Sequence, residues 1–349
     1  MRFCRLLALL AVGWLLTGCN PFDSADPMME EYVERVARVL ELDAVYSELP
    51  AASNLPRRRD RQLVMPELDM DMLDFLSLYG CELQYVIGEK NSVMGKVMQP
   101  LNRLRYELRF IDAAEDCLPD IEREGVKASL QEAVASKKES LPIALWNATW
   151  GVEEIETLFT LAKGDYPVAH EGNPVSDLSI DANRLNDTAA QLLAGDLSPS
   201  LDYVGGVQQR WQAEHRAGQL INSARLLVAR LEDASTLLKQ RIDGRPLCID
   251  GKPNNQSDIV QSMFFSVYIE KIQPYMSQVQ KAETQLLEPL SQLASMQFPV
   301  MPPEFREWYD YHLNIEGKES LWGRLDSAMA EHTRLWQTLL EQCGLRPQA

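Results

Sequence analysis

The fold is decided by residues 201–242, which read LDYVGGVQQRWQAEHRAGQLINSARLLVARLEDASTLLKQRI. Apolar residues recur there three or four positions apart, the spacing that places them on one face of an α-helix. The stripe consists of Val207, Trp211, Ala217, Ile221, Ala224, Val228, Leu231 and Leu238. It predicts one uninterrupted helix of roughly 60 Å, at 1.5 Å per residue.

The same spacing continues on both sides of this stretch, from residue 28 onward, and alternation with a period of two is hard to find. The pattern predicts an all-α fold, an elongated bundle of long antiparallel helices. The other expected helices cover residues 28–48, 67–98, 100–114, 127–150, 153–162, 175–195, 257–294 and 318–342. Pro142 is expected to kink or divide its helix, and Pro274 and Pro289 to bend theirs. We expect a single helical body over 28–349, with a subdivision into 28–170 and 171–349 as the alternative.

The composition is acidic, with 34 Lys plus Arg against 51 Asp plus Glu and a net charge of −17. A hydrophobic content of 46% excludes a disordered or collagenous chain. Nucleic acid is not expected as a partner, because binding phosphates requires a basic face. The one basic run, with arginines at 57, 58, 59 and 61, allows contact with lipid phosphate or a polyanionic saccharide, but a solvated loop is favoured.

The N-terminus has the pattern of a secretory signal peptide over residues 1–18. Arg2 and Arg5 precede an apolar stretch at 6–16, which is too short to cross a bilayer core of about 30 Å. Leu16-Thr17-Gly18-Cys19 resembles the bacterial lipobox, so Cys19 is expected to carry the lipid. The membrane is then a partner through this lipid. Cleavage would remove Arg2 and Arg5 and change the net charge from −17 to −19.

The residues after Cys19 bear on where the protein is held. Asn20 stands where lipoproteins retained in the inner membrane carry Asp, so the resemblance implies an outer-membrane protein that faces the periplasm. Residues 19–27 are short and turn-rich, and we expect them to form a brief lipidated tether.

Four cysteines belong to the folded body, and a compartment outside the cytoplasm permits disulfides. Cys81 and Cys117 lie at similar distances from the turn near Gln99, so an antiparallel hairpin would bring them level. The helix over 257–294 leads away from Cys248 and the last helix returns Cys343 to the same end. We therefore expect the disulfides Cys81–Cys117 and Cys248–Cys343. By the chain-entropy relation, they stabilise the folded protein by about 3.8 and 4.7 kcal/mol.

The search for chemistry finds no catalytic residue, cofactor or metal site. The cysteines form no Cys-x-x-Cys pair, and none of the usual hydrolase, metalloprotease or phosphate-loop motifs is present in the mature chain. His332 lies on the apolar stripe of the last helix and is interpreted as a packed core residue. His170, His215 and His312 have no acid at metal-ligand spacing.

Two further groups of side chains leave alternatives open. Six tryptophans suit core packing or, less favoured, an apolar groove for a lipid or glycan. They are Trp146, Trp150, Trp211, Trp308, Trp322 and Trp336. Arg103, Glu107 and Arg109 beside Tyr106 allow an internal or an exposed ion pair.

Short pieces across nearly the whole mature chain are shared with a known family. They are Leu73-Asp74-Phe75-Leu76, Cys81-Glu82-Leu83, Gly88-Glu89-Lys90-Asn91-Ser92, Met94-Gly95-Lys96-Val97, Arg105-Tyr106-Glu107-Leu108-Arg109-Phe110, Trp146-Asn147-Ala148-Thr149-Trp150, Arg245-Pro246-Leu247-Cys248 and Gln273-Pro274-Tyr275. With them the chain resembles a Gram-negative lipoprotein family catalogued only as a domain of unknown function, although Lys90 stands where Arg is expected. The resemblance implies the lipid anchor and adds no catalytic residue.

Together these features favour a non-catalytic scaffold or binding module of the cell envelope. An enzyme acting on an envelope polymer or lipid is the alternative. An envelope protein or polymer is the expected partner beside the membrane.

Overall fold

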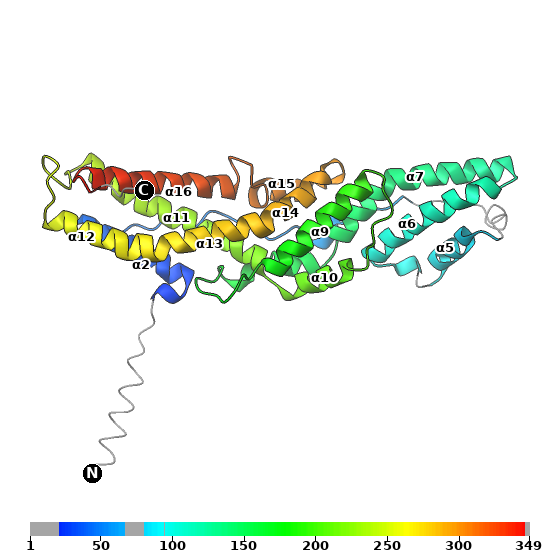
Figure 1. Cartoon of the computed structure of the whole chain (residues 1–349), viewed down its shortest axis with the longest axis horizontal. Helices are drawn as coiled ribbons and strands as arrows, with labels where there is room; N and C mark the ends of the chain where they lie inside the picture. The colour runs from blue at the N-terminus through cyan, green and yellow to red at the C-terminus, as the bar shows by residue number, and fades with distance from the viewer. Residues whose placement is uncertain (1–20, 67–79, 94, 346–349) are drawn as a thin grey trace, which may run out of the picture.

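The computed structural model describes residues 21–66, 80–93 and 95–345. Helices form an elongated body, as Figure 1 shows, and the all-α prediction is confirmed. Among the described residues the one β-type pairing is an isolated bridge between Ile249 and Lys252. The expected signal peptide over 1–18, the expected lipid site Cys19 and most of the first half of the expected helix 67–98 lie outside the described residues.

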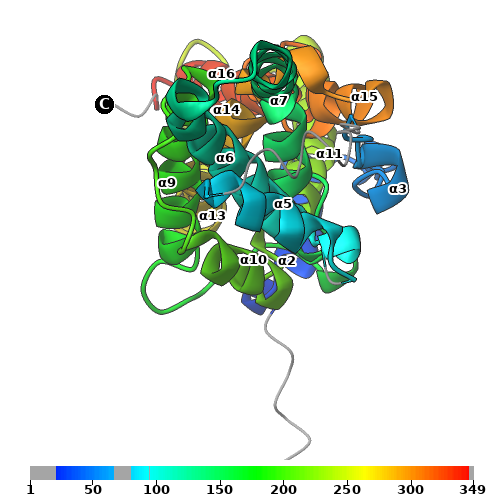
Figure 2. The ribbon, with the colours of Figure 1, turned by 90° about the vertical axis from the view of Figure 1, so that its right-hand side faces the viewer.

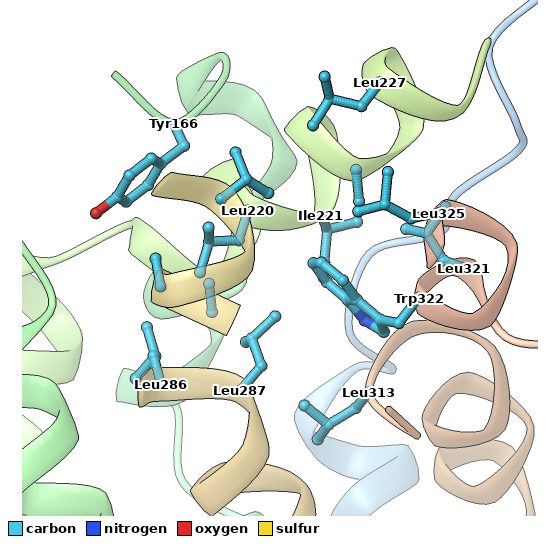
Figure 3. Close-up of a cluster of buried hydrophobic side chains, with 14 of the residues drawn as sticks. Tyr166, Leu220, Ile221, Leu227, Leu286, Leu287, Leu313, Leu321, Trp322 and Leu325 are labelled. Atoms are coloured by element: carbon cyan, nitrogen blue, oxygen red, sulfur yellow. The ribbon is translucent and has the colours of Figure 1, made fainter. Parts of the chain in front are cut away.

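One end of the body is a bundle around α11. Its helices are α2 (Ala25–Leu40), α11 (Arg216–Asp243), α12 (Asn255–Met263), η5 (Phe264–Ile272), α13 (Gln273–Ala282) and α16 (Leu321–Glu341). Figure 3 shows how side chains of α11 and α16, among them Leu220, Ile221 and Trp322, fill the space between the helices. These side chains are almost completely removed from water, and burial of this kind stabilises roughly 25 cal/mol per Å² of apolar area.

The middle of the body consists of shorter helices. They are α8 (Glu154–Leu158), η4 (Leu161–Lys163), α9 (Ser176–Leu193), α10 (Val204–Ala213), η6 (Glu283–Leu287), α14 (Glu288–Met296), η7 (Phe298–Val300) and α15 (Pro303–His312). The large hydrophobic core of the α11 bundle continues through this region without interruption.

The other end is formed by α5 (Glu82–Asn91), η2 (Gly95–Val97), α6 (Pro100–Cys117), η3 (Leu118–Asp120) and α7 (Glu124–Thr149). Figure 2 looks at this end. A second, smaller core joins these helices, and Cys81–Cys117 ties the start of α5 to the end of α6. The second disulfide, Cys248–Cys343, closes the opposite end of the body, so both expected pairings are confirmed.

Several helices differ from the expectation. The helix expected to run to residue 98 ends at Asn91 as α5, and the short η2 follows it. The first helix ends at Leu40 instead of near residue 48, because Glu41 adopts a left-handed conformation with φ 59°. The N–H of Leu42 then donates to the carbonyl of Ala37 at 2.9 Å, which caps the helix and sends the chain onward without helical structure. In addition, α15 forms a helix that the sequence pattern had not indicated.

The predicted single helix over 201–242 is wrong, because it is divided at Glu214, whose backbone is extended. α10 packs against α8, while α11 begins at Arg216. A Cβ on Gly218 would lie 2.0 Å from the carbonyl oxygen of Thr160. Glycine at this position therefore lets the first turn of α11 lie directly on the main chain after α8.

The prolines are accommodated without a break in the helices. η5 and η6 are π-helical segments that end two residues before Pro274 and Pro289. A proline has no N–H to donate and its ring crowds the carbonyl four residues earlier, and a wider π turn makes room for that carbonyl. Pro142 lies inside α7, which continues as one helix, so this proline does not divide it.

Candidate functional site

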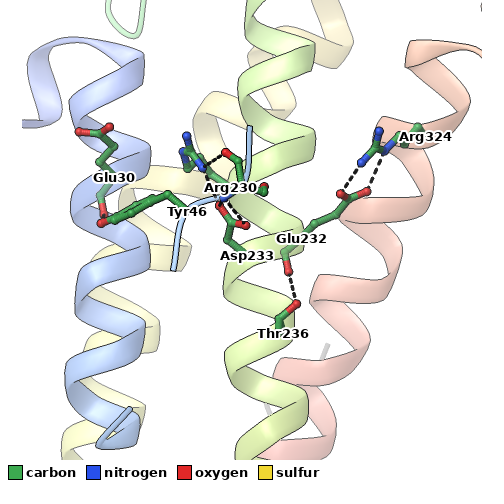
Figure 4. Close-up of polar contacts among 8 residues, drawn as sticks. Glu30, Tyr46, Arg230, Glu232, Asp233, Thr236 and Arg324 are labelled. Carbon is green, nitrogen blue, oxygen red and sulfur yellow. Dashed lines mark hydrogen bonds and ion pairs between the residues drawn. The ribbon is translucent and has the colours of Figure 1, made fainter. Parts of the chain in front are cut away.

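The strap, which we define as residues 42–57, runs without helical structure from the end of α2 toward the middle of the body. Its main chain is bound by side chains of α11. The N–H of Ser47 donates to the carboxylate of Asp233 at 3.1 Å, and Arg230 donates to the carbonyl of Ser47 at 3.1 Å. Figure 4 shows Arg230 and Asp233 beside Tyr46 of the strap, with the Arg230 guanidinium 5.1 Å from the Tyr46 ring centroid.

α15 binds the strap further along the chain. The N–H of Ser53 donates to Nε2 of His312 at 3.1 Å, and Nε1 of Trp308 donates to the carbonyl of Ser53 at 3.1 Å. Two side chains of one helix thus satisfy both main-chain polar groups of a single strap residue. The strap is held in place much as a bound peptide would be.

A groove with a volume of about 630 Å³ lies between the strap and α15, and we call it the strap groove. Its strap side is lined by Ala51, Ala52, Ser53, Asn54 and Pro56. Its helix side is lined by Glu304, Glu307, Trp308, Tyr311 and His312. The helix side is therefore an aromatic wall, and such a wall with a few polar groups at the rim is typical of binding sites.

His312 is a structural part of the groove. Its Nδ1 lies 3.0 Å from the carbonyl oxygen of Trp308, so this nitrogen carries the proton and Nε2 accepts from Ser53. Its ring stacks on Trp308 with centroids 5.3 Å apart. Burial lowers the pKa of His312, which keeps the ring neutral. Neither nitrogen is left to act as a base on a ligand.

Glu304 and Glu307 carry exposed carboxylates on the rim of the groove. Among the residues that the structure describes, neither forms an ion pair or a side-chain hydrogen bond. The groove therefore brings an aromatic wall and a negatively charged rim together, a combination that the sequence pattern does not indicate. The local sequence does contain a signal for the helix α15. Pro302-Pro303 suits a helix start, and the aromatic residues Phe305, Trp308, Tyr309 and His312 follow at helical spacing.

The basic run forms the short helix α3 (Arg58–Arg61), which lies beside α15 (Figure 2). Arg61 is completely buried. Its guanidinium donates to the carbonyls of Trp150 and Val152 after α7 and forms an ion pair with Glu156 at 2.5 Å. For this arginine both interpretations, a solvated loop and a phosphate contact, are wrong. Arg58 pairs with Glu153 and Arg59 with Asp60.

His332 is completely buried in the α11 bundle. Nε2 faces the hydroxyl of Tyr32 at 2.5 Å and Nε1 of Trp336 at 3.0 Å, and Nδ1 lies 2.9 Å from Oγ of Ser235. Since two donors face Nε2, we assign the proton to Nδ1. Burial lowers the pKa of His332 to about 3. This histidine is the packed core residue that the sequence indicated.

The other histidines lie apart from the groove. Nδ1 of His215 is 3.3 Å from the carbonyl of Thr157, and Nδ1 of exposed His170 is 2.9 Å from the carbonyl of Gly172. No group of three or more His, Cys, Asp or Glu side chains suited to a metal ion occurs in the described part of the chain.

The remaining open alternatives are decided by burial. Five of the six tryptophans, Trp308 excepted, are at most 1% exposed and pack in the core. Trp308 lines the strap groove. Glu107 is completely buried and pairs with Arg103 and with Lys137 at 2.6 Å, so this ion pair is internal, whereas Arg109 pairs with exposed Glu89 at 2.8 Å.

Comparisons with known proteins identify the family of the chain. Residues 29–347 match the family described as "Protein of unknown function (DUF3080)". No curated protein and no solved structure matches the chain. Within the described ranges, no helix has the length and apolar character needed to cross a membrane.

Proposed function

We propose a function from the strap groove itself, because the chain belongs to DUF3080, a family whose function is unknown. The protein is a lipid-anchored binding module of the Gram-negative envelope. Cys19 holds it at the outer membrane, with the body facing the periplasm, and the strap groove receives an envelope protein or polymer. The observation that carries the binding role is the groove of about 630 Å³ with an aromatic wall on α15 and a carboxylate rim.

The anchor is supported by the position of the lipobox, directly after the apolar stretch of the signal pattern. Two disulfides agree with an oxidising compartment. Two or three acyl chains at about 0.8 kcal/mol per buried methylene would hold the body at the membrane for its lifetime.

Metabolic labelling with a fatty-acid probe tests the anchor. The wild type and Cys4→Ala, which changes the other signal-region cysteine, are expected to be labelled, and Cys19→Ala is not. An unlabelled wild type contradicts lipidation. Fractionation of the two membranes tests the location, since Asn20→Asp is expected to move the protein from the outer to the inner membrane.

The alternative is an enzyme that acts on an envelope polymer or lipid, and His312 with Glu304 and Glu307 would be its natural centre. General base catalysis requires a nitrogen that is free to accept the proton of the substrate or of water. Hydrogen bonds to Ser53 and Trp308 engage both nitrogens of His312, which favours the binding role.

Photocrosslinking in cells tests the groove as the binding surface. A benzophenone amino acid at position 54 or 307 is expected to capture the same partner from both sides of the groove. The same group at position 180 on α9, where Ile180 is 63% exposed, is the matched control and is expected to capture nothing in common. If lipidated protein gives no product from positions 54 and 307, the strap groove is not the binding surface.

A further inference from the structure

The strap offers main-chain groups that the body does not use. Ser53 is bound through both its N–H and its carbonyl to α15. By contrast, no hydrogen bond with another described residue engages the N–H or carbonyl groups of Ala51, Ala52 or Asn54. Ala51, Ser53 and Asn54 are exposed. A non-helical segment with open main-chain groups can accept a second extended chain alongside it.

The apolar surface of the strap extends beyond the groove. Val45, Tyr46 and Leu49 are 71%, 40% and 37% exposed, just upstream of the groove-lining residues. Three exposed apolar side chains within five positions suit contact with another polypeptide.

The rim of the groove specifies the charge of the ligand. Glu304 and Glu307 are three residues apart on α15, about 4.5 Å along the axis. Alternate side chains of an extended strand lie about 7 Å apart on the same face, within reach of both carboxylates. Tyr311, half-buried on the same side of the groove, adds an aromatic ring that attracts a cation. None of the groove-lining residues is a lysine or arginine. Of the nearby arginines, Arg58 and Arg59 have acidic neighbours, and Arg57 at the end of the strap is exposed.

We propose that the strap groove binds an extended, basic polypeptide segment of a partner protein. The main chain of the segment pairs with the open groups of Ala51, Ala52 and Asn54, and its alternate Lys or Arg side chains meet Glu304 and Glu307. This inference rests on the proposed binding role and adds the chemical class of the partner.

Fluorescence anisotropy with the mature, disulfide-bonded protein tests the charge requirement. The probe is a labelled decapeptide of alternating Lys and Leu, and the control probe alternates Glu and Leu. Glu304→Gln with Glu307→Gln is expected to weaken binding of the Lys-Leu peptide about tenfold, the effect of losing roughly 1.4 kcal/mol. Glu316→Gln with Glu319→Gln makes the same change in net charge on exposed residues outside the groove, and it is expected to change binding less than about twofold.

The charge inference is overturned if the two pairs of substitutions weaken binding equally, because attraction is then a property of the whole acidic surface. It is also overturned if the Glu-Leu peptide binds as well as the Lys-Leu peptide. Charge reversal gives a positive check, since Glu304→Lys with Glu307→Lys is expected to make the protein prefer the Glu-Leu peptide.

Two isomeric probes test the pairing of main chains. One Lys-Leu peptide is N-methylated at odd positions and the other at even positions, so each has one blocked edge. Only one edge can pair with the strap, so one isomer is expected to retain binding and the other to lose it. Equal binding of both isomers overturns main-chain pairing. These peptides could fail to bind while crosslinkers at positions 54 and 307 still capture a partner. In that case the proposed binding role is kept, and the inference that the partner segment is basic and extended is rejected.

Discussion

At the scale of single residues, the buried polar groups of the α11 bundle are satisfied by one another. The hydroxyl of Tyr32 lies 2.5 Å from Nε2 of His332 and accepts from Nε1 of Trp336 at 2.8 Å. A buried polar group without a partner costs about 1–3 kcal/mol, so this network fixes the relative positions of α2 and α16 as well as filling the core.

Tyr32→Phe removes the shared hydroxyl and keeps the ring. We expect the free energy of unfolding in urea to fall by about 1–2 kcal/mol, because Ser235 and Trp336 still bind His332 but one donor is lost. Tyr85→Phe, at a tyrosine that is 69% exposed, is the control and should have no measurable effect. Equal effects of both substitutions would show that the network adds nothing to stability.

The neutral state of His332 makes stability depend on pH. Its pKa in the folded protein is about 3, below the ordinary 6.5, so between these values the unfolded chain binds a proton that the folded chain does not. The free energy of unfolding should therefore fall as pH falls from 6.5 toward 3, by up to about 1.4 kcal/mol per pH unit. His332→Gln is expected to have a shallower slope than the wild type. His170→Gln, at an exposed histidine, is expected to keep the wild-type slope.

At the scale of the elements, proline and tertiary contacts together shape the helices. The second π segment, η6, ends just before Pro289 and begins with Glu283. Burial, followed by the nearby carboxylates of Asp326 and Glu288, raises the pKa of Glu283 to about 7. The turn that accommodates the proline thus also places an acid where ionisation is unfavourable.

Glu283→Gln is expected to stabilise the protein at pH 8 by about 1 kcal/mol, a value reduced for solvent screening. Between pH 4.5 and about 7 the folded wild type binds a proton that the unfolded chain releases, so its stability falls as pH rises through this range. Chemical unfolding at pH 4 should show little difference between variant and wild type. Glu316→Gln, an exposed control, should show no difference at either pH, and a gain of Glu283→Gln at pH 4 equal to that at pH 8 would contradict the assignment.

At the scale of the whole molecule, two cores of unequal size divide the body. The large core reaches from α2 to Cys343, whereas the small core joins only α5, α6 and the first part of α7. The small core has less apolar area to bury, so the disulfide at that end carries a larger share of its stability.

Hydrogen exchange should detect this division. Cys81→Ala with Cys117→Ala is expected to speed exchange of the amides in α5 and the second half of α6 by about 100-fold, while amides of α11 change little. Cys248→Ala with Cys343→Ala is expected to affect the α12 and α16 ends near its own site instead. A uniform increase over the whole chain in either variant would mean that the body opens as one unit.

The sequence by itself determined the features that depend on neighbouring residues. Helical spacing gives the all-α fold, and Pro100 marks the start of α6. Both disulfides follow from the lengths of the helices between the cysteines, although α5 and η2 replace the continuous helix expected before Gln99. These properties survive small errors in helix boundaries, because hairpin geometry tolerates them.

The tertiary structure alone decided where α2 ends, where α10 and α11 separate, and how the strap groove forms. The physical reason is that the groups responsible are far apart in the chain. Main-chain groups of Ser47 and Ser53 are satisfied by Asp233 and His312, 186 and 259 positions away. Likewise Gly218 fits the main chain of Thr160 only in the folded protein. The spacing of apolar residues within one segment contains no information about such distant partners. The groove therefore forms, and can be recognised, only when the helices are packed together.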